Sequence, residues 1–231
     1  MNTPPIIREE RIGGQRLILG DCLQVMPFLQ YDAICSDPPY GIAYVHGAEK
    51  RKHGSKHNNK PIIGDNQPFD PETFIKGPSI LWGANHYAPR LPPSPTWLVW
   101  DKRCGRGGGP DQADAEFAWS NLGGPARCIN HYWSGFARDS EQGIPREHPT
   151  QKPIAVMEWC LGFLPDAKII LDPFMGSGTT LVACQRLGRA GIGIEIDPDY
   201  FAIACKRVDE ATRQPDLFVT PNPKPIQESL L

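Results

Sequence analysis

Two stretches of this chain, one near each end, show a strand, a helix and a second strand in immediate succession. The first spans residues 16–35, where Asp21 is placed to cap the helix between two apolar runs. The second has strands expected at 168–171 and 191–196 and helices expected at 177–187 and 199–208. Because a helical crossover joins parallel strands, this alternation predicts an α/β fold: a doubly wound, mostly parallel Rossmann-like sheet with helices on both faces.

The middle of the chain is less regular. We expect strands at 79–82 and 97–100, an antiparallel pair formed by 116–119 and 127–133, and a helix at 154–163. Residues 41–70 are polar and basic and lack periodicity, so they are interpreted as a long mobile excursion outside the core.

Length and composition indicate one domain. At 231 residues the chain can build its own core, and we expect a domain over 1–212 followed by a Pro-containing tail over 213–231. The N-terminal decapeptide lacks the features of a signal peptide, and no run approaches the ~18 apolar residues of a membrane span. Seven cysteines without a Cys-x-x-Cys pair, and six histidines without metal-ligand spacing, favour a reduced, cytoplasmic protein that has no metal site.

An unusual corner follows the strand expected at 31–35. Asp37, Pro38, Pro39 and Tyr40 come directly after it. Each proline fixes its own φ and pushes the preceding residue out of the helical region, so the corner is stiff and extended. It therefore holds a carboxylate, a free carbonyl and an aromatic face at the carboxyl end of a strand, where open α/β sheets bind ligands.

A glycine-rich turn follows the strand expected at 168–171. It contains Gly176 and Gly178 and precedes a helix, which lets a ligand approach backbone N–H groups. Glu195 ends the next strand, where a carboxylate can accept both ribose hydroxyls of an adenosine. The turn lacks the lysine of a phosphate-binding loop. These features leave two readings open: a dinucleotide with hydride transfer, or S-adenosylmethionine with methyl transfer.

The corner at Asp37 favours methyl transfer. The exocyclic amine of a base is a poor nucleophile because its lone pair is delocalised into the ring. The Asp37 carboxylate and the Pro38 carbonyl can accept its two N–H groups, and Tyr40 offers a face on which an extruded base can stack. Hydride transfer does not require two hydrogen-bond acceptors and an aromatic face at this position.

Five segments together resemble the amino-methylating DNA methyltransferases in which the catalytic motif precedes the cofactor motif. They are LILGDCLQVM, DAICSDPPYGI, HPTQKP, LDPFMGSGTT and GIGIEIDPDYFAIACKRV. The resemblance implies that Asp37, Pro38, Pro39 and Tyr40 are catalytic. It implies that S-adenosylmethionine is bound by Asp172, Phe174, Gly176, Gly178, Glu195, Thr150 and Lys152. Asp21 either contacts this cofactor or only caps its helix.

The resemblance also implies a substrate and its recognition region. Asp at the first position of the catalytic motif leans toward N6 of adenine in duplex DNA; N4 of cytosine and the same chemistry on RNA are the alternatives. Target recognition is assigned to the variable region within about 43–147. There a run with five Lys or Arg and one acid predicts DNA phosphate contacts from Lys50, Arg51, Lys52 and Lys56. A non-catalytic DNA-binding module is disfavoured by the intact corner.

One motif lies outside this pattern. The tail sequence Gln214–Phe218 resembles the Gln-x-x-Leu-Phe peptide that binds the bacterial sliding clamp. It is interpreted either as a clamp tether or as a segment that docks Leu217 and Phe218 on the enzyme itself. The sequence leaves open whether the protein is a monomer or a homodimer.

Overall fold

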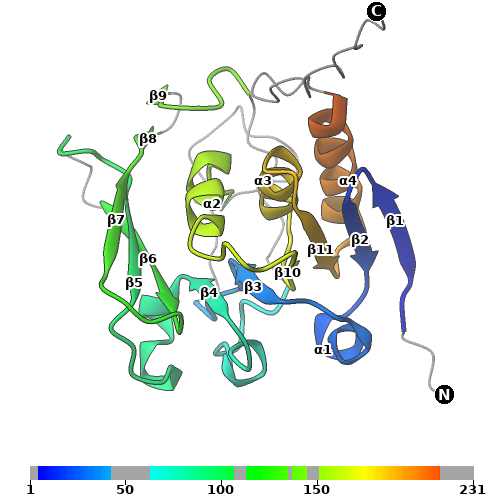
Figure 1. The fold of residues 1–231 in the computed structure, drawn as a ribbon, viewed down its shortest axis with the longest axis horizontal. Coiled ribbons are helices and arrows are strands. Elements are labelled where there is room, and N and C mark those ends of the chain that lie inside the picture. Colours follow the sequence, from blue (N-terminus) through cyan, green and yellow to red (C-terminus); the bar gives the residue numbers. More distant parts are fainter. Residues whose placement is uncertain (1–4, 43–62, 107–112, 135–136, 145–150, 214–231) are drawn as a thin grey trace, which may run out of the picture.

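The computed structural model describes residues 5–42, 63–106, 113–134, 137–144 and 151–213, which form a layered α/β domain (Figure 1). Its main sheet has nine strands within these ranges, in the order β1-β2-β11-β10-β3-β4-β6-β5-β7. Their bounds are β1 Arg8–Ile12, β2 Gln15–Leu19, β3 Ala33–Ser36, β4 Ser79–Trp82, β5 Trp97–Asp101, β6 Ala115–Ser120, β7 Arg127–Asn130, β10 Ile169–Asp172 and β11 Ala190–Glu195. A separate pair comprises β8 Trp133–Ser134 and β9 Ala137–Arg138.

The five central strands β2, β11, β10, β3 and β4 are all mutually parallel, as the β/α alternation predicts. Their carboxyl ends therefore lie along one edge of the sheet. β6 runs antiparallel between β4 and β5, so β5 ends and β6 begins at this same edge. This edge receives the residues that follow each strand, including the Asp37 corner.

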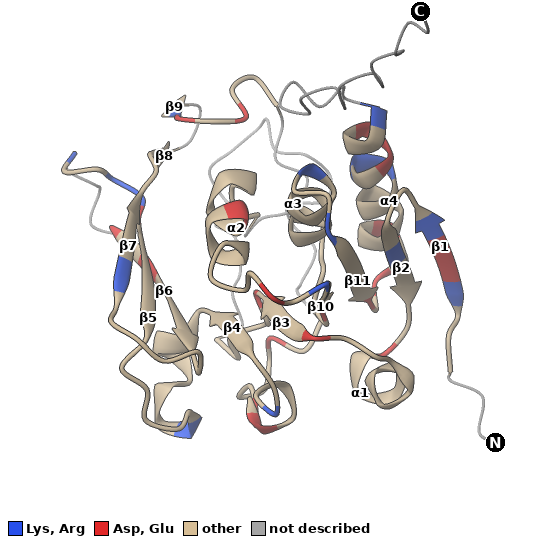
Figure 2. Ribbon diagram, viewed as in Figure 1, with Lys and Arg blue, Asp and Glu red and all other residues tan. Residues whose placement is uncertain are grey.

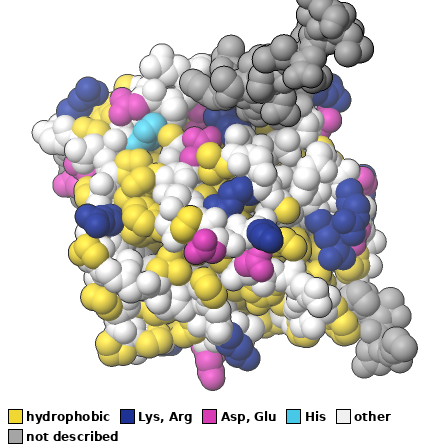
Figure 3. All heavy atoms as spheres, in the orientation of Figure 1, with side chains coloured by type: hydrophobic (Ala, Val, Ile, Leu, Met, Phe, Trp, Pro, Cys, Tyr) yellow, Lys and Arg dark blue, Asp and Glu magenta, His cyan; other side chains and the backbone are white. Residues whose placement is uncertain are grey.

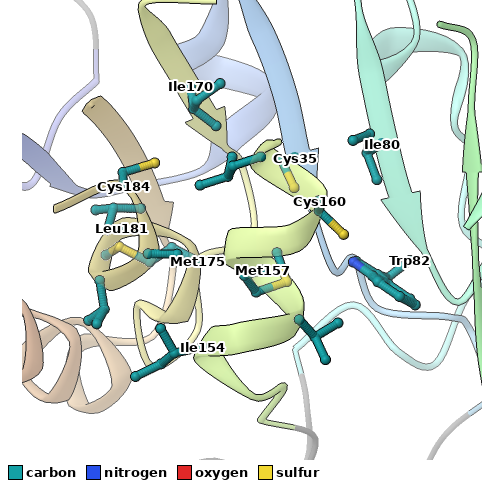
Figure 4. Packing of buried hydrophobic residues seen from close by; sticks show 14 of the residues in the cluster. Cys35, Ile80, Trp82, Ile154, Met157, Cys160, Ile170, Met175, Leu181 and Cys184 are labelled. Carbon is teal, nitrogen blue, oxygen red and sulfur yellow. The ribbon is translucent and has the colours of Figure 1, made fainter. Parts of the chain in front are cut away.

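Helices cover both faces of the sheet, as expected. α2 Ile154–Leu161, α3 Thr179–Arg186 and α4 Pro198–Arg213 lie on one face, and the short α1 Cys22–Val25 lies on the other (Figure 1). On the first face, Met157 and Cys160 of α2 pack with Cys35, Ile80 and Trp82 of the sheet (Figure 4). The second face is completed by α1 and short 3₁₀ turns.

Two expectations for the middle of the chain are wrong. The segments 116–119 and 127–133 do not pair with each other: β6 pairs antiparallel with β4 and β5, and β7 pairs parallel with β5. A hairpin of these two segments and the observed pairing with other strands fit the same local sequence pattern. Only the order of the strands in the whole sheet distinguishes them. Residues 63–70 are also not an excursion, since Phe69 and Asp65 are buried against the sheet. The rest of the basic segment, 43–62, lies outside the described residues.

The edge strand β1 was not expected from its sequence. Arg8–Ile12 carries charges of both signs, visible along the strand in Figure 2, and pairs antiparallel with β2. Such charges protect a sheet edge from pairing with another chain. On the face seen in Figure 3, basic and acidic side chains are likewise interspersed. Among the described residues, no helix has the length and apolar character to cross a membrane.

Candidate active site

One cavity of about 1030 Å³ lies at the carboxyl edge of the parallel strands. Its lining includes the four corner residues after β3, the glycine-rich turn after β10 and Glu195 at the end of β11. The sheet thus brings the two motifs to one cavity, although they are far apart in the sequence. The volume lies at the upper end of the roughly 300–1,000 Å³ typical of ligand pockets.

The corner formed by Asp37, Pro38, Pro39 and Tyr40 is held by polar contacts. Tyr40 Oη donates a hydrogen bond to Asp37 Oδ1 at 2.6 Å, and Lys152 Nζ lies 2.6 Å from Asp37 Oδ2. Burial raises the pKa of Asp37, and Lys152 opposes that effect. A carboxylate has about four acceptor positions, so two remain for a ligand. The following turn is fixed by Asp65, which accepts the N–H of Gly41 at 2.8 Å.

The Tyr40 ring packs against the residues that follow β4. Gly83 adopts a left-handed φ of +69°, and a Cβ at this position would overlap the Tyr40 ring. The exposed His86 stacks on Tyr40 with ring centroids 4.8 Å apart and planes at 11°. The segment 83–86 therefore sets the plane of the aromatic face that the corner presents.

A chain of alternating charges runs from the corner to the antiparallel strands. Lys152 contacts both Asp37 and Glu116, and Glu116 also contacts Lys102 at 2.7 Å. Burial opposes ionisation of Glu116, but Lys152 and Lys102 together lower its pKa to about 2. The two acids outweigh burial at Lys152 and raise its pKa. Glu116 and Lys152 are therefore both charged at neutral pH.

The glycine-rich turn is tied to the neighbouring strand ends. Glu195 Oε2 accepts the N–H of Gly176 at 2.9 Å, and Glu195 Oε1 accepts that of Asp197 at 2.8 Å. Burial raises the pKa of Glu195 to about 7. The buried Asp172 accepts the Ser36 hydroxyl at 2.5 Å and the Phe174 N–H at 3.1 Å, and burial raises its pKa to about 6.

Gly178 and Arg207 join this turn to α4. Gly178 has a φ of +80°, and a Cβ there would lie 3.0 Å from the Cβ of Ala204. Arg207 Nη1 donates to the Ser177 carbonyl at 2.7 Å and to the Thr179 hydroxyl at 3.1 Å. Gly178 is absent from the cavity lining, so the structure gives it a packing role between α3 and α4.

The remaining site residues have mixed outcomes. Asp21 caps α1 by accepting the N–H of Leu23 at 2.9 Å and also lines the cavity, so both of its readings stand. Phe174 lines the cavity and packs against Phe69 and Phe74. Thr150, Lys50, Arg51, Lys52, Lys56 and the segment Gln214–Phe218 lie outside the described residues.

Part of the chain is similar in sequence to known DNA methyltransferases. Residues 99–206 match the sequence model of the N6/N4 methyltransferase family, described as DNA methylase. The Type II methyltransferase M2.LlaDCHI of Lactococcus lactis subsp. cremoris is 42% identical over 79 residues, which are 34% of this chain and 29% of that protein. M.HpaI of Haemophilus parainfluenzae, also a Type II methyltransferase, is 46% identical over 65 residues, 28% of this chain and 21% of that protein. These matches support a relation to the amino-methylating DNA methyltransferase family over the matched segments.

The fold of the chain is similar to that of a solved methyltransferase. The solved PvuII DNA methyltransferase (cytosine-N4-specific) superposes with a TM-score of 0.55 at 13% identity, covering 90% of this chain and 94% of that one. The curated relatives are matched over less than a third of their length.

Several residues that contact the site were missed from the sequence. Glu116 and Lys102 are ordinary polar residues in or beside alternating strands, and Arg207 is one of several charges on an amphipathic helix. Gly83 offered the best signal, since a glycine directly after an apolar strand marks a turn or a close backbone approach.

Proposed function

We propose that this protein transfers a methyl group from S-adenosylmethionine to the N6 amine of an adenine in duplex DNA. The observation that carries the proposal is the shared cavity. The Asp37 corner and the Glu195 carboxylate face it from the ends of parallel strands β3 and β11, which flank β10 in the sheet. The match of residues 99–206 to the N6/N4 DNA methylase family model supports both the cofactor and the amine acceptor.

The residues present fit the cofactor. The Glu195 carboxylate retains acceptor positions beyond its two backbone contacts, which suits a ribose diol. Phe174 and Ile196 add apolar lining beside it, and Asp172 and Gly176 line the adjoining turn. These residues would hold S-adenosylmethionine, whose sulfonium supplies an electrophilic methyl group when bound. Contacts from Asp21, Gly178, Thr150 and Lys152 remain predictions.

The corner residues would act on the amine. The free acceptor positions of Asp37 and the Pro38 carbonyl would each accept an N–H, which raises electron density on the nitrogen. These acceptors are fixed before the reaction, so they stabilise the positive charge that develops there without reorganising. Tyr40 would stack on a base flipped out of the duplex, which offsets a cost of a few kcal/mol. The amine sheds its proton after methylation, so no general base is required.

Two alternatives share this chemistry. N4-cytosine carries a similar amine, and the family includes both acceptors. RNA in place of duplex DNA would need the same corner. Recognition of either substrate is assigned to residues within about 43–147, with phosphate contacts from Lys50, Arg51, Lys52 and Lys56 as a prediction. With a DNA substrate, we also propose that the protein is cytoplasmic and is encoded by a bacterium or a phage.

The deciding experiment is transfer of labelled methyl from S-adenosylmethionine to unmethylated genomic DNA, with nucleoside mass spectrometry of the product. N6-methyladenine in the product is expected. N4-methylcytosine would support the cytosine alternative instead. No label in DNA, with cofactor still bound, would move the search to RNA substrates. Asp37→Ala should abolish transfer while cofactor affinity stays near that of the wild type. Equal loss of both would mean that the corner is misassigned.

The tail carries a separate proposal. The sequence Gln214–Phe218 would bind the bacterial sliding clamp through Leu217 and Phe218. A pull-down with purified clamp should succeed with the full chain and fail when both residues are changed to Ala. Failure with the folded wild-type chain would refute it. Light scattering of the same sample would decide between monomer and homodimer.

A further inference from the structure

The ammonium group of Lys152 has a complete set of acceptors inside the protein. Its nitrogen lies 2.6 Å from Asp37 Oδ2, 3.2 Å from Glu116 Oε2 and 3.2 Å from Tyr40 Oη. The residue is only 4% exposed. An ammonium has three protons to donate, and these three oxygens account for all of them. In this arrangement none is left for the cofactor.

Glu116 reaches Lys152 from a rigid part of the sheet. It lies in β6, whose backbone pairs with both β4 and β5. Its Oε1 accepts from Lys102 at 2.7 Å while its Oε2 faces Lys152, so each carboxylate oxygen has its own cation. The Trp82 ring lies on another side of the Lys152 ammonium, with its centroid 5.2 Å away. The ammonium is thus confined by charge and by an aromatic surface.

We propose that Glu116 is a positioning residue for methyl transfer: it shares the Lys152 ammonium with Asp37 and so leaves the Asp37 carboxylate oxygens available as acceptors for the target amine. This inference rests on the proposed function, and it assigns Lys152 to Asp37 in place of the cofactor. Glu116 lies in the antiparallel strand β6, outside the five segments that resemble the family.

Sharing matters because Asp37 has two opposing requirements. Burial raises its pKa, so a cation must be close to keep it ionised. A cation bound to Asp37 alone would compete with the amine for the same oxygens. Lys152 keeps Asp37 ionised, whereas Glu116 binds the same ammonium and so keeps the Asp37 oxygens available to the amine.

The charged groups around Asp37 predict the direction in which substitutions of Glu116 and Lys152 change its pKa. Lys152 lowers its pKa and Glu116 raises it, while Tyr40 donates to it. Asp172 and Tyr87 also lie within its electrostatic reach. Removing the charge of Glu116 should therefore lower the Asp37 pKa, and removing that of Lys152 should raise it.

The test is an NMR titration of Asp37 in the cofactor-free protein, using [¹³Cγ]aspartate and an assignment from Asp37→Asn. Glu116→Gln should lower the Asp37 midpoint, Lys152→Met should raise it, and Glu116→Asp, which keeps the charge, should stay near the wild type. The matched control is Glu9→Gln. Glu9 also bridges two cations and is 26% exposed, as Glu116 is, but it lies on edge strand β1. It should leave the Asp37 midpoint unchanged.

Activity supplies the second readout. With Glu116→Gln, kcat should fall about tenfold or more. Lys152 would then bind Asp37 alone, move its carboxylate and compete with the target amine for its oxygens. The acid limb of its pH profile should move to lower pH, a combination that a merely structural role would not give. An unchanged Asp37 midpoint in both Glu116→Gln and Lys152→Met would overturn the inference. A wild-type protein that binds cofactor but methylates no nucleic acid would instead overturn the proposed function, and the titration would still report on Glu116.

Discussion

The carboxylate of Glu195 accepts the backbone N–H of Gly176 at 2.9 Å, which ties the end of β11 to the glycine-rich turn after β10. One side chain thus fixes the turn and offers its remaining acceptor positions to the cavity. Because burial raises the pKa of Glu195 to about 7, both roles depend on pH near neutrality.

Cofactor affinity should rise with pH through the titration of Glu195. Below its pKa of about 7 the carboxyl is protonated and accepts fewer hydrogen bonds from a ribose diol. We expect S-adenosylmethionine to bind the wild type more tightly at about pH 8 than at about pH 6, measured by calorimetry. Glu195→Gln should bind more weakly at high pH and lose this dependence. Parallel pH profiles for the two proteins would contradict the assignment.

The same substitution should change how stability depends on pH. The folded pKa of Glu195 lies above its ordinary value of 4.5, so the folded state binds the proton more tightly than the unfolded state does. The resulting stabilisation is fully present below about pH 4.5 and is lost as the pH rises through about 7. In cofactor-free protein, Glu195→Gln should therefore gain stability relative to the wild type across this window. Chemical denaturation at several pH values measures the difference, and a constant difference would refute it.

The two motif-bearing halves of the site were predictable because each is local. A corner after a strand and a glycine turn before a helix are both set by neighbouring residues, and parallel strands then bring their carboxyl ends to one edge. The expected strands at 79–82 and 97–100 were confirmed for the same reason.

The rest depends on long-range order. Glu116 meets Lys152 only because β6 is inserted antiparallel between β4 and β5, and a local pattern cannot distinguish that order from a pairing of β6 with β7. Phe69 was missed because a single aromatic in a polar segment shows no periodicity, yet it is buried against Phe74 and Phe174.

Arg207 should affect cofactor binding without touching the cavity. One of its nitrogens holds both the carbonyl and the hydroxyl of Ser177, each at 2.7 Å. Arg207→Lys loses this geometry, so we expect a loss of about 1.5–3 kcal/mol in stability and weaker cofactor binding. Arg213→Lys is the matched control on the same helix, since its pair with Asp209 has the arginine 75% exposed. Equal effects in the two variants would show that Arg207 does not organise the turn.

Gly83→Ala should separate methyl transfer from cofactor binding. The residue has a φ of +69°, and its new Cβ would overlap the Tyr40 ring, which would then leave its position beside Asp37.

The matched control is Gly188→Ala, because Gly188 has a φ of +62° with open space around its Cβ position. Both variants carry the left-handed backbone penalty of about 1–2 kcal/mol, and Gly83→Ala also displaces the Tyr40 ring, so its melting temperature should fall further than that of Gly188→Ala. Only Gly83→Ala should lose methyl transfer, by about a hundredfold in kcat, because the Tyr40 contact to Asp37 is displaced. Cofactor affinity, measured by calorimetry, should match the wild type in both. A fully active Gly83→Ala enzyme would mean that the position of the Tyr40 ring is unimportant for the reaction, and the corner would then act through Asp37 and the prolines alone.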